Sequence, residues 1–404
     1  MEDLILPQTY ILGNGEISMK IKQISIDNVC GIKHLDITFN DGLNLICGEN
    51  GVGKTTILKS ISYYFIDGNK SYIKKHYGDE KGSVDLCFTE NKNYHYEITD
   101  FTPGNTQRYT SDLKFSNHLL YFPTSRTIKY EKINSIPIMQ NINSDIDSNS
   151  HSTNLLLLGA GNDIKKWYVN VYVFSKVGSL NAHQQKHLEL CNKIFSLLDE
   201  SISIETVVPN CEILLKQKNN KIYFEMLSDG YKSCIIITFG VIKEIEYRFP
   251  HMDANDFDGT IMIDEIDLHL HPQWQKKLVK ILKYIFPNAQ IIATTHSPSI
   301  LQTAKSEEII PLYKDENGDI HVKELHLGEY GLQGWTLEEI MRDVMGMKST
   351  TSDLYMKVIR NFNESMNDEN QEEILKHYKI LKQMLHPQNP MLQLLEIQVA
   401  EWKN

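Results

Sequence analysis

Apolar and polar residues alternate along the first patterned stretch of the chain, residues 19–39. A period of two is typical of half-buried β-strands, so this stretch predicts two paired strands. A mostly apolar run at 43–47 then predicts a buried strand, and apolar residues at helical spacing predict a helix over 55–65. The N-terminal part is therefore expected to combine a strand pair, a buried strand and a helix.

The middle of the chain changes from strand-like to helical patterns. Short strands are predicted at 83–88, 94–98 and 118–122. The stretch 140–154 is almost wholly polar and predicts a mobile loop. Helical spacing of apolar residues from 162 to 202 then predicts a helical insertion.

The second half returns to strands and ends in helices. Strand patterns occur at 213–215, 222–224, 260–263 and 290–295, and a helix is predicted over 229–244. An Asn-Gly pair within 315–319 predicts a hairpin turn. Helices are predicted at 337–345, where Thr336 and Glu339 form a capping box, and at 372–385 and 390–402.

Composition narrows the class of protein. The 404 residues are 41% hydrophobic and 23% charged, as in a globular protein. The longest apolar stretch, 234–242, is too short to cross a bilayer, and the first residues do not resemble a secretion signal. Six cysteines occur without a C-x-x-C pair, which indicates reduced thiols. These features predict a cytoplasmic protein with no membrane partner.

The net charge of −11 argues against indiscriminate coating of nucleic acid, which relies on dense lysine and arginine. A local basic and aromatic cluster offers a DNA contact, comprising Lys70, Tyr72, Lys74, Lys75, His76 and Tyr77. The alternative is a solvated loop whose lysine stems lie along apolar surface. DNA binding therefore stays open but is not required.

A glycine-rich run follows the predicted strand 43–47. It fits the pattern G-x-x-x-x-G-K-[ST] and comprises Gly48, Glu49, Asn50, Gly51, Val52, Gly53, Lys54, Thr55 and Thr56. Glycines let the backbone wrap closely around phosphate, and the N–H groups at the helix start point at the anion. Lys54 is expected to reach the β- and γ-phosphates, and Thr55 to offer its hydroxyl to Mg²⁺.

A pair of acids and a histidine follow two later strands. Asp264 and Glu265 end the strand at 260–263, where Asp264 is placed to bind Mg²⁺ and Glu265 to act as general base on water. His296 follows the strand at 290–295, and a parallel neighbour would bring it to the same sheet edge, near the γ-phosphate. The alternatives are a strand that runs into an acidic loop and a histidine satisfied by core contacts.

A third motif opens the predicted helix at 229–244. Ser228 or Asp229 is suited to cap this helix, and the free N–H groups with Gly230 form a second anion site. A plain capped helix is the alternative. Two anion sites in one chain call for an explanation.

These motifs together resemble ABC-class ATPases of the non-transporter branch, which includes RecF and SMC heads and the OLD-like ATPases of anti-phage defence. The resemblance covers residues 19–312 and implies an α/β ABC-ATPase head. Such a head has a mixed P-loop sheet and an antiparallel β subdomain, here joined by a helical insertion and an α-helical C-terminal region. By the resemblance, 48–56 is Walker A, 228–230 the signature, 264–265 Walker B and His296 the switch histidine.

The resemblance also implies a division of the chain and a mode of assembly. The division is an N-terminal lobe at 1–135, a polar loop and helical insertion at 136–210, a C-terminal lobe at 211–313 and a helical docking region at 314–404. In this family the signature of one subunit closes on ATP held by another. The resemblance therefore implies a two-fold homo-oligomer with Mg²⁺ and ATP at its interface.

Several positions depart from the family pattern. The turn at Val29 and Cys30 lacks the expected aromatic and basic residues, and either Gln107 or Arg126 stands for the Q-loop glutamine. His269 and His271 with His296 suit zinc by spacing, but they also match the His-Leu-His-Pro segment of OLD-like ATPases. That segment lies in 266–272, where the family has its D-loop.

The tail lacks the strand-end glutamate and Asp-x-Asp of a Toprim nuclease, so no intrinsic nuclease activity is expected. The Gly334-Trp335-Thr336 opening and the helical tail resemble ATPases of Septu-type and retron-associated defence systems, which work with a separate effector. The expected partner is a nuclease of HNH or Toprim type. A RecF-like DNA-repair ATPase is the alternative, and an ABC transporter subunit is disfavoured by Asp229-Gly230-Tyr231.

Overall fold

The computed structural model describes residues 20–402, apart from 66–67, 71–72, 90–91, 104–106, 110–116, 127, 129, 131 and 134–160. The chain forms two compact units: the first comprises 1–340 and 344–346, and the second comprises 341–343 and 347–404. The loop predicted at 140–154 lies outside the described residues. The four-part division of the chain stays a prediction.

A six-stranded sheet with the strand order β15-β14-β3-β13-β12-β8 forms the centre of the first unit. All neighbours are parallel except β15, which pairs antiparallel with β14. Parallel strands bury both faces, and β3, β12 and β13 are buried at every position, which explains their continuous apolar sequences. The strands are β3 (Leu43–Gly48), β8 (Leu119–Phe122), β12 (Thr260–Ile263), β13 (Gln290–Thr294), β14 (Ile309–Lys314) and β15 (Ile320–Val322).

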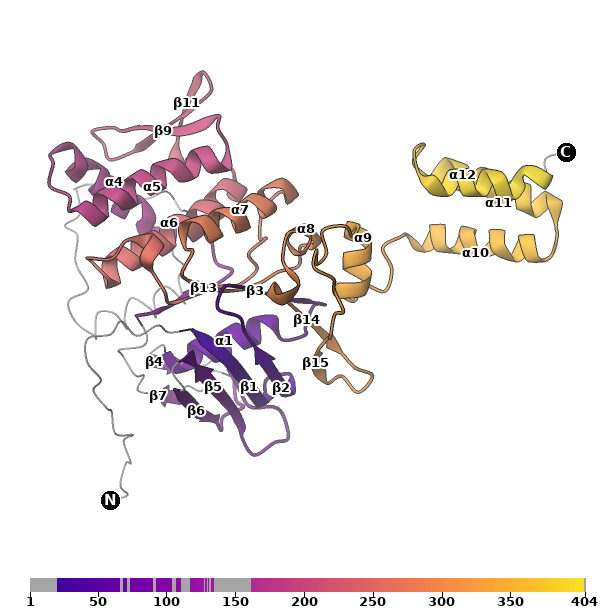
Figure 1. Ribbon diagram of the computed structural model, residues 1–404, viewed down its shortest axis with the longest axis horizontal. Coiled ribbons are helices and arrows are strands. Elements are labelled where there is room, and N and C mark those ends of the chain that lie inside the picture. The colour runs from indigo at the N-terminus through magenta and orange to yellow at the C-terminus, as the bar shows by residue number, and fades with distance from the viewer. Residues whose placement is uncertain are drawn as a thin grey trace. The chain divides into compact units, whose positions relative to one another are not determined.

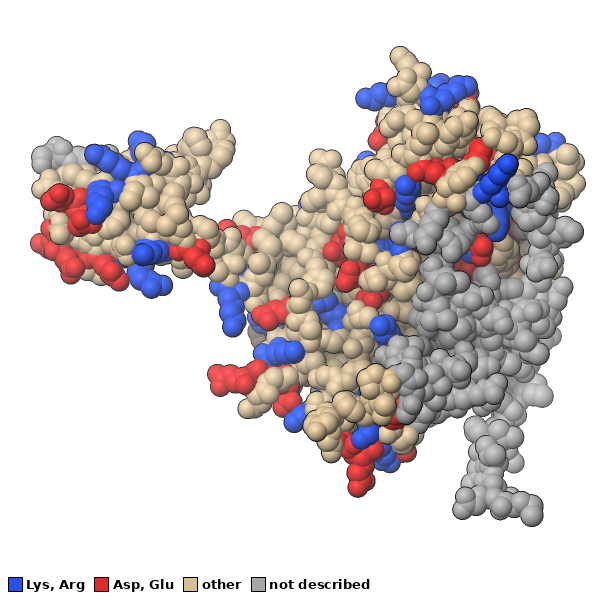
Figure 2. Space-filling view, turned by 180° about the vertical axis from the view of Figure 1, so that it is seen from behind, with Lys and Arg blue, Asp and Glu red and all other residues tan. Residues whose placement is uncertain are grey.

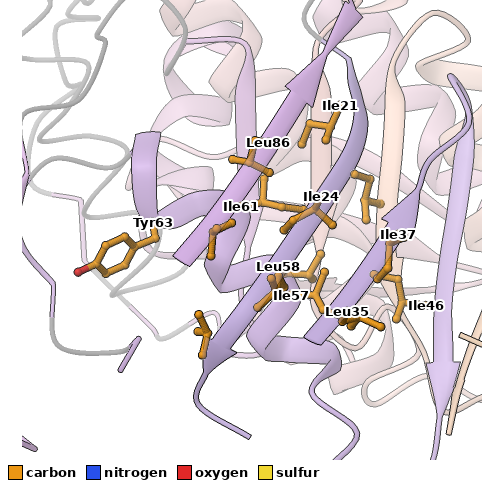
Figure 3. Packing of buried hydrophobic residues seen from close by; sticks show 14 of the residues in the cluster. Ile21, Ile24, Leu35, Ile37, Ile46, Ile57, Leu58, Ile61, Tyr63 and Leu86 are labelled. Atoms are coloured by element: carbon orange, nitrogen blue, oxygen red, sulfur yellow. The ribbon is translucent and has the colours of Figure 1, made fainter. Parts of the chain in front are cut away.

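An antiparallel sheet with the order β2-β1-β5-β6 lies on one side of the central sheet (Figure 1). Its strands are β1 (Ile21–Val29), β2 (Ile32–Thr38), β5 (Gly82–Phe88) and β6 (Asn93–Ile98). The predicted strand pair at 19–39 is confirmed as the β1–β2 hairpin. Figure 3 shows Ile57, Leu58 and Ile61 of α1 (Lys54–Phe65) facing apolar side chains of these strands. This packing fixes the helix that begins at the glycine-rich loop.

The other side of the central sheet is helical (Figure 1). The insertion consists of α4 (Gly161–Lys176) and α5 (Ala182–Leu198), and these lie beside α6 (Asp229–Arg248) and α7 (Pro272–Ile285). Short strands form two small sheets, β9 (Ile202–Val207) with β10 (Ile213–Gln217) and β11 (Asn220–Tyr223), and β4 (Gly68–Lys70) with β7 (Gln107–Tyr109). Among the described residues no helix is both long and apolar enough to span a membrane.

The chain beyond β15 is helical, as predicted, but two elements differ from expectation. The predicted helix at 337–345 is a single α-turn, α9 (Leu337–Glu339), that continues as a π-helix over Ile340–Val344. The second unit holds α11 (Gln371–Met384), α12 (Pro390–Val399) and a further helix, α10 (Asp353–Asn367), that had not been predicted. Its apolar core comprises Val358, Phe362, Ile374, Tyr378, Leu381, Leu395 and Val399.

The expected fold class, an α/β ATPase head with a mixed sheet and an antiparallel β subdomain, is confirmed. The remaining short helix of the first unit, α8 (Pro298–Leu301), begins directly after the strand end that carries His296. The predicted hairpin turn at 315–319 is confirmed between β14 and β15. Within the described chain, the sequence patterns had indicated neither α7 nor α8.

Candidate nucleotide site

The predicted motifs follow strands that are neighbours in the central sheet. β3 pairs in parallel with β13, β13 with β12, and β12 with β8. Parallel strands end at one edge, so the residues that follow β3, β12 and β13 gather at the carboxyl edge where open α/β sheets bind ligands. The sheet topology thus brings the glycine-rich loop, the acid pair and His296 to one place.

The glycine-rich loop needs glycine for steric reasons. Gly48, Gly51 and Gly53 all have positive φ angles, of 138°, 78° and 80°. A Cβ atom on Gly48 would lie 2.2 Å from the backbone oxygen of Leu312 on the adjacent β14, closer than any real contact. The loop runs directly into α1, whose first N–H groups have no acceptor within the helix. These free donors at the start of α1 suit a phosphate group.

Lys54 is buried at the base of this loop and folds back over it. Its Nζ donates to the backbone oxygens of Gly48 at 2.9 Å and Glu49 at 2.8 Å. Burial lowers the pKa of Lys54, while the nearby acids Asp264 and Glu265 act in the opposite direction. The ammonium group is therefore held at the loop by backbone carbonyls.

Thr55 and Asp264 are in direct contact although 209 residues separate them. The hydroxyl Oγ1 of Thr55 donates to Oδ1 of Asp264 at 3.0 Å. The same carboxylate oxygen accepts a hydrogen bond from Oγ1 of Thr294, on β13, at 2.7 Å. A hydroxyl and a carboxylate at this spacing are hard oxygen donors of the kind that Mg²⁺ prefers. The chemistry of the donor set fits the predicted metal.

Glu265 has an unusual backbone conformation, with φ at 50°. Non-glycine residues rarely adopt this left-handed region, and such residues concentrate at functional sites. The N–H of Glu265 donates to Oγ1 of Thr294 at 2.6 Å. The side chain is half-buried.

His296 lies at the end of β13 and is held by Asp267. Its backbone N–H donates to Oδ1 of Asp267 at 3.1 Å, and Oγ1 of Thr295 donates to the same oxygen at 2.6 Å. Burial, and then the charge of Lys54, lower the pKa of His296. Both effects favour the neutral form of the imidazole.

Arg126, one of two residues predicted for the Q-loop position, lies in this cluster. It follows β8 and donates to the backbone oxygen of Asp264 and to Oγ of Ser233 at 3.4 Å. Burial lowers the pKa of Arg126 to about 10, although the negative charges of Asp264 and other nearby acids act to raise it. The other predicted residue, Gln107, lies on β7, and its side chain is outside the described set.

The signature residues do not join this cluster in the described chain: no hydrogen bond or ion pair links 228–230 to 48–56. Ser228 is the N-cap residue of α6, but its side chain makes no capping hydrogen bond. The side chain of Asp229 is 82% exposed, 3.7 Å from Lys232. The start of this 20-residue helix therefore faces outward with its end groups available.

The other candidate residues have structural partners. His271 caps α7 by accepting at Nδ1 from the N–H of Gln273 at 3.4 Å, and the described residues form no metal-binding group of three or more His, Cys, Asp or Glu side chains. In the basic cluster, Lys74 pairs with Asp100 at 2.6 Å, and Lys75 bonds to the backbone oxygen of Asp79. Tyr72 and the side chain of Lys70 lie outside the described residues.

Charges of both signs are interspersed on the face shown in Figure 2. That face shows no continuous basic patch of the kind that tracks a nucleic-acid backbone. The contacts of Lys74 and Lys75 within the chain do not support the DNA contact that the sequence left open.

Two residues of the site had not been identified from the sequence, Thr294 and Asp267. Each lies next to a predicted motif, since Thr294 precedes Thr295-His296 and Asp267 follows Asp264-Glu265 at a spacing of two. Their roles depend on contacts between separate strands, which local sequence does not specify. Polar residues at the ends of buried parallel strands were the available signal.

A phosphate loop, an acid pair and a histidine at one edge of a parallel sheet are the arrangement of a P-loop ATPase. A family model described as "AAA domain" matches residues 23–235, and one described as "AAA domain, putative AbiEii toxin, Type IV TA system" matches residues 220–302. The chain is therefore an AAA-domain ATPase of the nucleotide-binding class.

The chain belongs to the Septu PtuA family. It is 40% identical over 399 residues to the Septu protein PtuA of Bacillus thuringiensis, covering 95% of this chain and 98% of that relative. The Septu protein PtuA of Bacillus mycoides (strain KBAB4) is 26% identical, with 88% of this chain and 49% of that relative covered. The resemblance to anti-phage defence ATPases that the motifs indicated is confirmed.

More distant proteins also match. The "Retron Vc95 probable ATPase" of Vibrio cholerae is 23% identical over 383 residues, covering 74% of each protein. Among solved structures, an SMC head bound to the C-winged helix domain of ScpA covers 76% of this chain and 97% of its own, at 14% identity and a TM-score of 0.43.

Proposed function

We propose that this chain binds Mg²⁺ and ATP between two copies of itself, hydrolyses the ATP, and thereby controls a separate nuclease in anti-phage defence. The observation that carries the proposal is that Thr55, Asp264 and Glu265 lie together. Thr55 bonds to Asp264, and Asp264 and Glu265 both bond to the residue at the end of β13, Thr294. A loop built for phosphate, oxygen donors for a metal and a base for water meet there. The family membership supports the defence role.

Binding rests on groups that have no other evident task. The N–H groups at the start of α1 and the ammonium of Lys54 suit the β- and γ-phosphates, and phosphate oxygens would replace the carbonyl contacts of Lys54 at 2.8–2.9 Å. Thr55 and Asp264 are the residues that would hold Mg²⁺. When bound, this ion neutralises charge on the phosphate oxygens.

Hydrolysis requires a base and a group near the γ-phosphate. Glu265 is half-buried at the end of β12, where its carboxylate would take a proton from the attacking water. His296, whose pKa is lowered by burial and by the charge of Lys54, would hydrogen-bond the γ-phosphate. Both residues come from adjacent parallel strands, so a rigid sheet sets their separation.

The second copy would supply the start of α6. Ser228 makes no capping bond, and Asp229 is exposed, so the helix end is available to an anion from outside the subunit. A two-fold arrangement places the start of α6 from each copy on the nucleotide of the other. This proposal accounts for two anion sites in a chain with one phosphate loop.

The phosphate loop lies close to the residue at which the chain leaves the first unit. A Cβ on Gly346 would lie 2.8 Å from Oε1 of Glu49, a residue of the phosphate loop, and Gly346 has a φ of 77°. The second unit continues from Met347. A change in the loop on nucleotide binding would therefore press directly on the residue where the chain leaves the first unit.

The second unit carries the surface proposed for the nuclease or for further copies of the chain. Large apolar side chains are exposed on it, among them Leu354, Met391, Leu394 and Ile397. Exposed apolar side chains on a small helical unit suit a protein partner. Effector docking at this unit would couple the nuclease to the nucleotide state.

The test is the ATP turnover of the variant Glu265→Gln. Loss of a general base slows hydrolysis by about 10²- to 10⁴-fold, while the affinity for ATP, measured by fluorescence of a labelled nucleotide, stays unchanged. Glu307→Gln, an exposed residue 4.0 Å from Lys305, is the matched control. Equal turnover in Glu265→Gln contradicts the role of the base, and absence of turnover in the unaltered chain contradicts hydrolysis.

The control of a nuclease is tested separately. Mixed with the nuclease subunit of its defence system, the chain should change DNA cleavage when ATP is added, and the chain alone should cut no DNA with Mg²⁺ or Mn²⁺. Cleavage by the chain alone would mean that it carries a nuclease site. DNA binding by an ATP-loaded dimer without any nuclease would favour the DNA-repair alternative.

A further inference from the structure

Thr294 makes contacts with both residues of the acid pair. Its hydroxyl donates to Oδ1 of Asp264 at 2.7 Å and accepts from the N–H of Glu265 at 2.6 Å. Its backbone oxygen accepts from the N–H of Ile266 at 2.9 Å. One fully buried residue on β13 thus binds three consecutive residues that follow β12.

These contacts hold a conformation that would not persist unaided. Glu265 has a φ of 50°, which is unfavourable for a residue with a side chain. The N–H groups on both sides of its Cα, those of Glu265 and Ile266, are bonded to the hydroxyl and the carbonyl of Thr294. Strained backbone persists where surrounding structure over-determines it, and here Thr294 provides two of the constraints.

The same hydroxyl also orients the carboxylate of Asp264. Oδ1 of Asp264 accepts from Thr294 and from Thr55, so two hydroxyl groups fix its rotation. Partners behind a metal-binding group commonly set its orientation and its affinity for the metal. A second pair of contacts, from Thr295 and the N–H of His296 to Asp267, holds the next residues of the two segments together.

We propose that Thr294 is a positioning residue for the ATPase reaction: its hydroxyl orients Asp264 toward the metal and holds Glu265 in the left-handed conformation that directs its carboxylate to water. Thr294 would act through Asp264 and Glu265 and not by touching the nucleotide or the metal. The inference rests on the proposed function of Asp264 and Glu265 and adds a residue to it. It predicts that the hydroxyl, rather than the methyl group, is what the site needs.

Two substitutions separate the hydroxyl from the packing. Thr294→Val keeps the shape and removes the hydroxyl, whereas Thr294→Ser keeps the hydroxyl and removes the methyl group. The matched control is Thr260→Val, because Thr260 is also fully buried, begins the neighbouring strand β12, and donates through its hydroxyl to Gln290 at 3.0 Å. Thr260 lies at the opposite end of the strand from the acid pair.

The first measurement is steady-state ATP turnover as a function of Mg²⁺ concentration. Thr294→Val should lower kcat about 10- to 100-fold and raise the Mg²⁺ concentration for half-maximal rate by about tenfold, the usual effect of removing a partner behind a metal ligand. Thr294→Ser and Thr260→Val should stay within about threefold of the unaltered chain in both values. Equal losses in the Val and Ser variants would show that packing matters instead and overturn the proposal.

The second measurement does not depend on turnover. In the nucleotide-free protein, hydrogen exchange followed by mass spectrometry should be faster in Thr294→Val for the peptide that contains residues 264–268, because the N–H of Glu265 loses its acceptor. Thr260→Val should leave that peptide unchanged. Unchanged exchange in Thr294→Val overturns the proposal, whether or not the unaltered chain hydrolyses ATP. Absence of ATP hydrolysis by the unaltered chain, in contrast, would count only against the proposed function.

Discussion

The substitution Gly48→Ala should damage the phosphate loop far more than Gly51→Ala, although both glycines have positive φ angles. A Cβ on Gly48 would lie 2.2 Å from the backbone oxygen of Leu312, which cannot move without shifting β14. A Cβ on Gly51 meets only Nζ of Lys314, at 3.7 Å, the end of a flexible side chain. The two variants therefore share the backbone strain and differ in the steric clash.

The magnitudes follow from these two terms. A left-handed conformation costs a residue with a Cβ about 1–2 kcal/mol, which is the whole effect expected for Gly51→Ala. Overpacking adds about 1–3 kcal/mol for Gly48→Ala. At roughly 2 °C of Tm per kcal/mol for a large unit, the expected losses are about 2–4 °C for Gly51→Ala and about 4–10 °C for Gly48→Ala.

Thermal unfolding of the nucleotide-free proteins measures this difference, and nucleotide binding adds a second readout. Addition of Mg²⁺ and ATP should raise the Tm of the unaltered chain, and Gly48→Ala should abolish the rise because the loop can no longer wrap the phosphates. If Gly48→Ala is as stable as Gly51→Ala, the close approach of β3 and β14 at this loop does not exist in solution.

Two further predictions concern a histidine and the C-terminal unit. Burial lowers the pKa of His296, so the unfolded chain binds a proton near pH 6.5 that the folded chain does not, and folding stability should fall as pH drops below that value. His296→Gln should therefore lose less Tm than the unaltered chain between pH 7.5 and 5.5, and equal losses would refute the depressed pKa. Phe362→Ala should remove about 3–5 kcal/mol from the core of the C-terminal unit and expose residues 347–404 to limited proteolysis, with ATP turnover intact. The exposed Leu354→Ala should leave proteolysis unchanged, and equal protection of both variants would contradict the assigned core.

The phosphate loop and the buried strands beside it could be predicted because they depend on local chemistry, whereas the order of the strands in the sheet was not predicted. Glycines next to an apolar strand and ahead of a helix leave few alternatives for residues 48–55. The apolar runs at β12 and β13 indicated buried parallel strands, and their polar ends indicated the functional edge. The antiparallel pair β1–β2 followed from its alternation of apolar and polar residues.

Two of the helices that the sequence analysis did not predict, α7 and α10, are amphipathic. The segment of α7 begins at Pro272, and its first six residues are mostly polar, although Leu278, Leu282 and Ile285 recur at helical spacing in its second half. In α10 the apolar residues, among them Val358 and Phe362, recur on one face, so this helix could have been predicted from its amphipathic pattern. At Ile340–Val344 the backbone forms the hydrogen bonds of a π-helix instead of an α-helix, and the residue types there did not indicate this difference.

The site shows the same limit more sharply. Thr55, Asp264 and His296 could be named because each belongs to a motif with a known chemical task. Thr294 could not, because its importance lies in hydrogen bonds to a segment 29 to 30 residues away. Contacts across neighbouring strands are set by the register of the whole sheet, and no local pattern encodes them.

The most direct test of the composite ATP site is a mixture of two inactive subunits, Lys54→Ala and Ser228→Phe, co-expressed in equal amounts. The first lacks a working phosphate loop, and the second lacks a working signature. In a head-to-tail dimer the mixed pair contains one intact site, with the loop of one subunit facing the signature of the other.

Random pairing makes half of the dimers mixed, and each has one working site of two, so ATP turnover should recover to about a quarter of that of the unaltered chain. If the mixture turns over ATP no faster than the sum of the two variants measured alone, the signature does not act on the nucleotide of a second subunit.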